Sequence, residues 1–251
     1  MEEHGVRISP EQFFALRLEL EGKIMQMEGE LIRKTGVRIN LNSPQQVSWL
    51  LFEHLGFEPL GKTKAGSLSV DAAVLTELAK REDTYSEIPR MLLEFRELSK
   101  MLSGFVIPFG KAAGDDGLIH TTFEPAVTGT GRLSSRDPNL QNIPVRSVEG
   151  RKIRTAFTAE RGKVLISADY AQIELVVLAH LSGDRNLCDA FINNIDVHKS
   201  TASLIYGVPM EEVTPEMRRN AKTLNFGLMY GMGAFSLAKD LGISRAKAKD
   251  F

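Results

Sequence analysis

Two cations and two aromatic rings recur at every fourth position, as Arg218, Lys222, Phe226 and Tyr230. At 3.6 residues per turn this spacing places all four side chains on one face of a helix, over roughly 18 Å. A nucleoside triphosphate has groups in the same order, since its phosphates would lie against the cations and its sugar and base against the rings. The pattern predicts a nucleotide-binding helix or, alternatively, an amphipathic helix with a solvated basic edge.

The sequence also predicts where this helix begins and how it packs. Thr214 is suited to cap its N-terminus, and Pro215 is suited to its first position. The helix N-terminus adds a partial positive charge next to the cations, which favours an anionic ligand. Small or apolar residues form the opposite row and predict a packing face (Ala221, Leu224, Leu228 and Gly231).

A second candidate is a carboxylate that follows an apolar run. Residues 164–168 read Val-Leu-Ile-Ser-Ala and predict a buried strand that ends at Asp169 and Tyr170. A helix is expected from Gln172 to residue 181, with Gly183 at its C-terminal cap. A carboxylate at the end of a strand can bind Mg²⁺, although an ordinary turn residue is the alternative for Asp169.

Several segments, in this order, resemble the polymerase core of family A DNA polymerases, the bacterial DNA polymerase I group. Residues 169–175, Asp-Tyr-Ala-Gln-Ile-Glu-Leu, resemble motif A, and residues 218–231 resemble motif B, the O helix of the fingers. Residues 130–144 resemble the segment that holds primer and template. The Asp-Val-His at 196–198 and the Gly-Lys-Thr at 61–63 are similar to two further family motifs. The resemblance extends from about Glu11 to the last residue.

The resemblance implies template-directed DNA synthesis, in which a primer 3′-hydroxyl attacks the α-phosphate of a deoxynucleoside triphosphate. Arg218, Lys222 and His198 are implied to hold the triphosphate, with Lys222 also protonating the leaving group. Asp169 and the carbonyl of Tyr170 are implied ligands of two Mg²⁺ ions. Primer-template DNA and deoxynucleoside triphosphates are therefore the expected partners.

Further residues are implied to contact the sugar, the base and the DNA. Glu174 would collide with a 2′-hydroxyl and so favour deoxynucleotides, Gln172 belongs to the same nucleotide site, and Phe226 and Tyr230 hold the nucleoside. Uncharged donors and acceptors can reach minor-groove acceptors that every base pair presents. The implied DNA contacts are Arg132, Asn139, Gln141, Asn142, Lys62 and Thr63.

The chain departs from the family pattern in two ways. Ala171 and Val176 stand where motif A usually has Ser and Arg, which affects the polar packing expected around the site. The 251 residues also contain no Val-His-Asp-Glu, the family's motif C. Two-metal phosphoryl transfer needs carboxylates that hold ions about 3.5–4 Å apart, and only one of the two principal Asp residues is present. The sequence thus predicts a polymerase fragment that is inactive alone.

Other classes of protein remain as alternatives. A non-catalytic DNA- and nucleotide-binding module of the same family is the main one, because motif C is missing. A single-subunit RNA polymerase has a similar cationic helix, but Glu174 argues against it. A purely structural helical protein would not need Asp169, Glu174, Lys222 and Tyr230 together.

Composition and charge agree with an intracellular nucleic-acid enzyme. A single cysteine, Cys188, excludes a disulfide framework, and neither a signal peptide nor a membrane span is expected. The sequence predicts a bacterial cytoplasmic protein that is associated with the nucleoid. It does not indicate which oligomeric state the chain adopts.

The net charge of −1 is unevenly distributed along the chain. Residues 128–163 carry eight basic and three acidic residues, and residues 217–249 carry seven basic residues and one acidic residue. These segments predict a groove that follows DNA phosphates or, alternatively, solvated basic faces.

The elements needed to position these residues predict an α+β fold. Helices are expected at residues 10–32, 44–54, 70–80 and 88–103, with Ser43 and Pro44 beginning the second. Strands are expected at residues 118–123, 153–158 and 164–168, and Ser244 caps a final helix. By resemblance, residues 1–105 form a helical thumb, residues 106–182 a palm with a small antiparallel sheet, and residues 183–251 incomplete fingers.

Overall fold

The computed structural model describes residues 1–81, 84–145, 147–241 and 243–250. The chain divides into two compact units, residues 1–166 and residues 167–251. It is mostly helical and has two small antiparallel sheets in its described part, which confirms the predicted α+β class. The division into thumb, palm and fingers stays a prediction.

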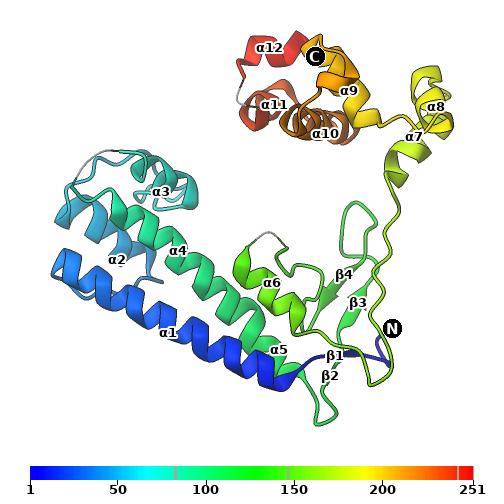
Figure 1. Ribbon diagram of the computed structural model, residues 1–251. Helices are drawn as coiled ribbons and strands as arrows, with labels where there is room; N and C mark the ends of the chain where they lie inside the picture. The colour runs from blue at the N-terminus through cyan, green and yellow to red at the C-terminus, as the bar shows by residue number, and fades with distance from the viewer. Residues whose placement is uncertain (82–83, 146, 242, 251) are drawn as a thin grey trace. The chain divides into compact units, whose positions relative to one another are not determined.

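The first unit is built on a long helix, α1 (Pro10–Thr35), that runs beside α4 (Glu87–Met101) (Figure 1). Ser9 caps α1 by accepting a hydrogen bond from the backbone N–H of Gln12. Gly36 ends the helix with φ 74°, a left-handed conformation that glycine adopts without a Cβ clash. The helix predicted at residues 10–32 is therefore confirmed and ends three residues later.

Shorter helices surround this pair. Ser43 accepts a hydrogen bond from the N–H of Gln46, so the predicted start at Ser43 and Pro44 is confirmed. Asp71 caps the third predicted helix by accepting from the N–H of Val74. The remaining helical elements of this unit are α2 (Pro44–Ser48), the π-helical η1 (Trp49–His54), α3 (Ala72–Leu78), the π-helical η2 (Leu102–Val106), α5 (Ile107–Ala112) and α6 (Val148–Thr155).

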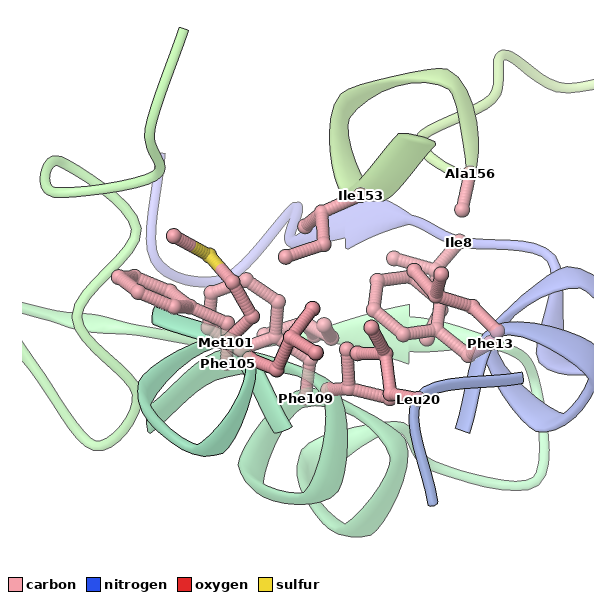
Figure 2. Packing of buried hydrophobic residues seen from close by; sticks show 12 residues of the cluster. Ile8, Phe13, Leu20, Met101, Phe105, Phe109, Ile153 and Ala156 are labelled. Carbon is pink, nitrogen blue, oxygen red and sulfur yellow. The ribbon is translucent and has the colours of Figure 1, made fainter. Parts of the chain in front are cut away.

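One hydrophobic core ties α6 to the long helices. Figure 2 shows Ile153 of α6 and Ala156, which follows this helix, packed in one cluster with Phe13 of α1 and Phe109 of α5. The Phe109 ring makes edge contacts with Phe13 at 6.0 Å and with Phe105 at 5.8 Å between centroids. Such aromatic pairs contribute about 0.5–1.5 kcal/mol beyond the area they bury. This core therefore holds parts of the predicted palm against the predicted thumb helices.

A second core lies farther along the α1 and α4 pair. Leu50 and Leu51 of η1, Leu75 of α3 and Leu92 of α4 are fully buried in it. Because α3 follows the 61–69 hairpin directly in the chain, this core fixes the base of the hairpin that carries Lys62 and Thr63.

Two antiparallel strand pairs complete the first unit. Strand β1 (Val6–Arg7) pairs with β2 (Leu118–Ile119), and β3 (Thr122–Glu124) pairs with β4 (Ser134–Arg136). The strand predicted at residues 118–123 thus forms as two short strands. Phe123 lies opposite Ser135, so the β3–β4 pair brings the start of the predicted primer-template segment next to β3.

Two of the predicted strands are wrong. Residues 148–155 form helix α6, which Ser147 caps by accepting from the N–H of Gly150, and only Phe157 makes an isolated bridge, to Ile8. Residues 164–168 have no regular structure, and the side chains of Val164 and Ile166 are 79% and 86% exposed. A strand is stabilised by a partner strand, and none pairs with residues 164–168 among those that the structure describes.

The second unit is entirely helical in its described part. Its elements are α7 (Ile173–Ser182), α8 (Arg185–Ile192), α9 (Val197–Tyr206), the 3-10 turn η3 (Met210–Glu212), α10 (Pro215–Met229), α11 (Ala234–Leu241) and α12 (Arg245–Asp250). Helix α7 ends at Gly183 with φ 63°, as predicted. Helix α10 begins at Pro215, with Thr214 accepting from the N–H of Met217, which confirms its predicted start.

Helix α10 packs closely along α9. Ala221 and Leu224 of its predicted packing row are buried, whereas the side chain of Leu228 lies outside the described residues. Arg146, counted above in the first basic segment, also lies outside them. In the part of the chain that the structure describes, no helix has the length and apolar character to span a membrane.

Candidate functional site

The start of α9 lies next to the cationic and aromatic row of α10, whereas Tyr230 at the end of this row contacts Glu174 of α7. The Nζ of Lys222 lies 5.9 Å from the centroid of the Phe226 ring, so the two side chains share one face of the helix. The His198 ring of α9 lies 5.5 Å from the Phe226 ring, tilted by 47°. The structure therefore brings together three residues that are predicted to contact a nucleotide.

The first cation of the row is oriented by a carboxylate. Asp196 caps α9 through the N–H of Lys199, and its other oxygen accepts a 2.7 Å hydrogen bond from the Nε of Arg218. Burial raises the pKa of Asp196, but the hydrogen bonds from Arg218 and Lys199 outweigh it and hold this pKa below its usual range. A guanidinium has five N–H donors and this contact uses one, so the pair can orient Arg218 without preventing it from binding an anion.

His198 is buried, with 1% of its surface exposed. Its Nδ1 lies 3.0 Å from the Nδ2 of Asn225, and its buried Nε2 has no hydrogen-bond partner. Burial lowers the pKa of His198; Asp196 opposes this, and the cations of Arg218 and Lys222 reinforce it. The imidazole is therefore favoured in its neutral form, next to two cations.

Glu174 and Tyr230 meet at the start of α7 and just past the end of α10. The hydroxyl of Tyr230 donates a hydrogen bond to the Glu174 carboxylate. Gln172 precedes α7 with φ 55°, a left-handed conformation that is uncommon outside glycine. Gln172 and Glu174 thus lie at the start of α7, and a hydrogen bond from Tyr230 holds the Glu174 carboxylate.

Asp169 and Tyr170 lie in the exposed segment before α7. In the described ranges of the chain, no three His, Cys, Asp or Glu side chains come close enough together to hold a metal ion. The metal-binding role of Asp169 and Tyr170 stays a prediction.

The predicted DNA contacts at residues 132–142 lie on a turn that is stabilised by hydrogen bonds of the buried Ser135 side chain. The buried hydroxyl of Ser135 donates to the Oδ1 of Asn139, which also accepts from the N–H of Gln141. The side chains of Arg132, Gln141 and Asn142 are exposed. Asn139 therefore shapes the turn with its oxygen, and the turn presents its neighbours to solvent.

Lys62 and Thr63 lie at the start of a tight hairpin. Lys62 bridges to Leu68, and the N–H of Thr63 donates to the carbonyl of Ser67 at 2.8 Å. Both residues line an open cavity of about 930 Å³ that also includes Trp49 and Arg96. The hairpin keeps the side chains of Lys62 and Thr63 exposed, as a phosphate contact requires.

The family model for DNA polymerase family A matches residues 10–251. The chain is 47% identical to the thermostable DNA polymerase I of Thermus aquaticus over its whole length and 45% identical to DNA polymerase I of Pseudomonas aeruginosa over 93% of its length. The chain belongs to DNA polymerase family A.

A solved structure supports the same fold. The chain is similar to the POL domain of Pol1 from M. smegmatis, in complex with DNA primer-template and dNTP, with a TM-score of 0.85 and 38% identity. This family A chain covers 30% of the T. aquaticus protein, 25% of the P. aeruginosa protein and 44% of the solved M. smegmatis chain. It spans under a third of the curated relatives it matches.

Two residues near His198 were not predicted from the sequence of this family A chain, namely Asn225, which contacts His198, and Thr201, which contacts Asn225. Asn225 donates to His198 and also to the hydroxyl of Thr201 on α9. A signal was present, because Asn225 follows Lys222 by three positions and is a polar residue inside a helix, close to the cationic row.

Proposed function

We propose that this chain forms the nucleotide-binding and DNA-binding part of a DNA polymerase, which adds deoxynucleotides to a primer 3′-hydroxyl. The observation that carries the proposal is the group of Arg218, Lys222, Phe226 and His198 on the facing sides of α9 and α10. Cations that are held in place before the substrate arrives stabilise phosphate charge without reorganising.

Arg218 and Lys222 are proposed to hold the triphosphate, and the Nζ of Lys222 to donate a proton to the leaving pyrophosphate. Phe226 and Tyr230 are proposed to contact the nucleoside. Glu174, held by Tyr230, would lie beside C2′ of the sugar and exclude a 2′-hydroxyl. Gln172 belongs to the same proposed site.

Polymerases of family A use divalent metal ions, and Asp169 is the residue of this chain proposed to bind them. Asp169 lies exposed in the segment before α7, and the roles proposed here for the other side chains of the site are binding, orientation and, for Lys222, proton donation.

Primer-template DNA is the proposed macromolecular partner, bound through Lys62, Thr63, Arg132, Asn139, Gln141 and Asn142. Support comes from their positions on an exposed hairpin and an exposed turn, and from the DNA in the similar M. smegmatis structure. The bacterial cytoplasm, near the nucleoid, is the proposed location.

The nucleotide site is tested by titrating the chain with dATP in a calorimeter. Arg218→Ala and Lys222→Ala each remove charged contacts, so the affinity should fall about 10- to 100-fold. Arg219→Ala is the matched control, since Arg219 is an exposed neighbour on the same helix and points to a different side. Equal affinities for Arg218→Ala and Arg219→Ala, or no binding of dATP to the unaltered chain, would argue against this site.

A non-catalytic DNA- and nucleotide-binding module is the second candidate, because the 251 residues lack a Val-His-Asp-Glu sequence. We expect the purified chain to bind primer-template DNA without extending the primer above background in the presence of Mg²⁺ and all four dNTPs. Extension at a rate proportional to the concentration of the chain would exclude the non-catalytic candidate.

A further inference from the structure

The hydrogen bonds around Asn225 determine which way its amide points. The hydroxyl of Thr201 donates to the carbonyl of Val197 at 2.8 Å, which is one helical turn earlier on α9. With its only proton used, this hydroxyl can accept but not donate again. The Asn225 atom 3.1 Å from it must therefore be the nitrogen Nδ2, as the structure has it.

The second proton of the Asn225 amide then determines the protonation of His198. Nδ2 lies 3.0 Å from the Nδ1 of His198, so Nδ1 must accept and cannot carry a proton. A neutral imidazole keeps its one proton on the other nitrogen, Nε2. The hydrogen-bond chain from Val197 through Thr201 and Asn225 thus selects a single tautomer.

The charges around the ring favour this neutral form. Arg218 and Lys222 approach from α10 and Asp196 from the start of α9; burial and the two cations outweigh Asp196 and lower the pKa of His198. The Nε2–H is buried and has no hydrogen-bond partner in the described part of the protein. Buried donors without a partner are rare in proteins, and such a donor next to two cations fits an anionic ligand.

We propose that Asn225 is a positioning residue, which holds His198 as the neutral tautomer with its proton on Nε2 and so presents an N–H donor to a phosphate group. The inference rests on the proposed function in one respect, namely that the phosphate belongs to a nucleoside triphosphate. The donor then needs no added proton, so its contribution to binding does not depend on protonation of the ring near neutral pH.

Nitrogen NMR of the 15N-labelled 251-residue chain tests the tautomer without any ligand. The two imidazole nitrogens have distinct shifts when one is protonated, and the His198 signals are assigned by their loss in His198→Gln. We expect a proton on Nε2 in the unaltered chain, a mixture of tautomers in Asn225→Ala, and a proton on Nδ1 in Asn225→Asp, where a carboxylate replaces the donor. Thr201→Val should weaken the preference while keeping Asn225 in place.

Asn220→Asp is the matched control. Asn220 lies on the same helix and donates to the Tyr206 hydroxyl of α9, but it does not contact His198. The same change of amide to carboxylate should leave the His198 signals as they are. A proton on Nδ1 in the unaltered chain, or an unchanged Nε2–H in Asn225→Ala, overturns the proposal.

Calorimetry with dATP separates this inference from the proposed function. We expect Asn225→Ala and His198→Gln each to weaken binding about tenfold, and the double variant to lose no more than either one, since both changes remove the same donor. If dATP binds the unaltered chain and Asn225→Ala with equal affinity, Asn225 has no positioning role. If dATP binds neither while the NMR result is as expected, the proposed function fails and the assigned tautomer stands.

Discussion

A single hydroxyl joins two candidate nucleotide contacts that are 56 residues apart. Tyr230 donates to the Glu174 carboxylate, so the position of Glu174 depends on the residue that follows α10. A carboxylate that is held in this way is less able to swing aside when a larger sugar enters. Selection against a 2′-hydroxyl would then require both residues, with Glu174 supplying the bulk and Tyr230 its orientation.

Glu174→Ala should therefore reduce the preference for dATP over ATP, because it removes the group that would meet the 2′-hydroxyl. Tyr230→Phe should reduce the preference less, since the carboxylate stays and loses only the hydrogen bond from Tyr230. Calorimetric titration of each variant with dATP and ATP measures the ratio of affinities. Lys222→Ala is the control and should weaken both nucleotides alike, because they share the triphosphate. An unchanged ratio in Glu174→Ala would make Glu174 a structural residue.

His198 should make the stability of the chain depend on pH. Because its pKa in the folded chain lies below the ordinary 6.5, the unfolded chain binds a proton more readily. The resulting stabilisation is fully present above pH 6.5 and is lost as the pH falls below it. Asp196, whose pKa is lowered from 3.8, contributes similarly but in a more acidic range.

Calorimetric unfolding at pH 7, 6 and 5 measures this effect. The unaltered chain should lose stability over the series, and His198→Phe should lose less, because it cannot take up the proton. His180→Phe, at an exposed position on α7, is the control and should keep the pH dependence of the unaltered chain. Identical pH dependence in both variants would contradict a role for His198.

At the scale of elements, the sequence predicted helices well because their signals are local. Ser43 with Pro44 and Thr214 with Pro215 begin helices where they were expected, since a cap acts within a few residues of itself. The strand predicted at residues 153–158 is wrong because so short a segment does not distinguish helix from strand, whereas the Ser147 cap begins a helix that includes its first residues. The 164–168 strand failed because its stability depends on a partner strand, which local sequence does not specify.

The residues of the candidate site could be predicted from the sequence, but most contacts between them could not. The α10 row followed from helical periodicity, whereas the contacts of Asn225 with His198 and of Tyr230 with Glu174 join residues on different elements. Spacing along the chain does not determine such pairs. Family resemblance named most of the side chains, but their partners were identified only by the packing of α10 on α9 and by the contact of Tyr230 with the start of α7.

Gly150 tests the packing of α6 against the preceding loop. A Cβ at this position would lie 2.5 Å from the carbonyl oxygen of Pro144, and backbone cannot move aside as a flexible side chain can. Gly150→Ala should therefore cost about 1–3 kcal/mol, despite a gain of about 1 kcal/mol in helix propensity. Urea unfolding followed by circular dichroism measures the change.

Gly22→Ala is the matched control for Gly150→Ala. Gly22 lies inside α1, and nothing lies within 4 Å of a Cβ built there. This variant should be more stable than the unaltered chain by about 0.5–1 kcal/mol, because alanine loses less backbone freedom on folding. If both variants shifted stability equally, the close approach of Pro144 would not limit position 150.

At the scale of the whole molecule, the net charge of −1 conceals an uneven distribution. Part of the positive charge of residues 128–163 is already paired within the protein. Arg136 contacts Glu124 and Asp137 at 2.6 Å, and Lys152 contacts Glu19 on α1. Fewer DNA phosphates should therefore be neutralised than the number of basic residues suggests.

DNA affinity at several salt concentrations measures how many phosphates the chain neutralises. Each one contributes about 0.9 to the slope of log affinity against log salt, so a groove that follows the backbone should give a slope of several units with little dependence on sequence. Lys62→Ala should reduce the slope by about one, because Lys62 is exposed on the 61–69 hairpin. Lys80→Ala, which removes a cation paired with Glu77 on α3, should leave it unchanged. A slope near zero would mean that the basic segments are solvated faces that do not contact DNA phosphates. A strong preference for one duplex would mean that the chain recognises DNA by reading bases.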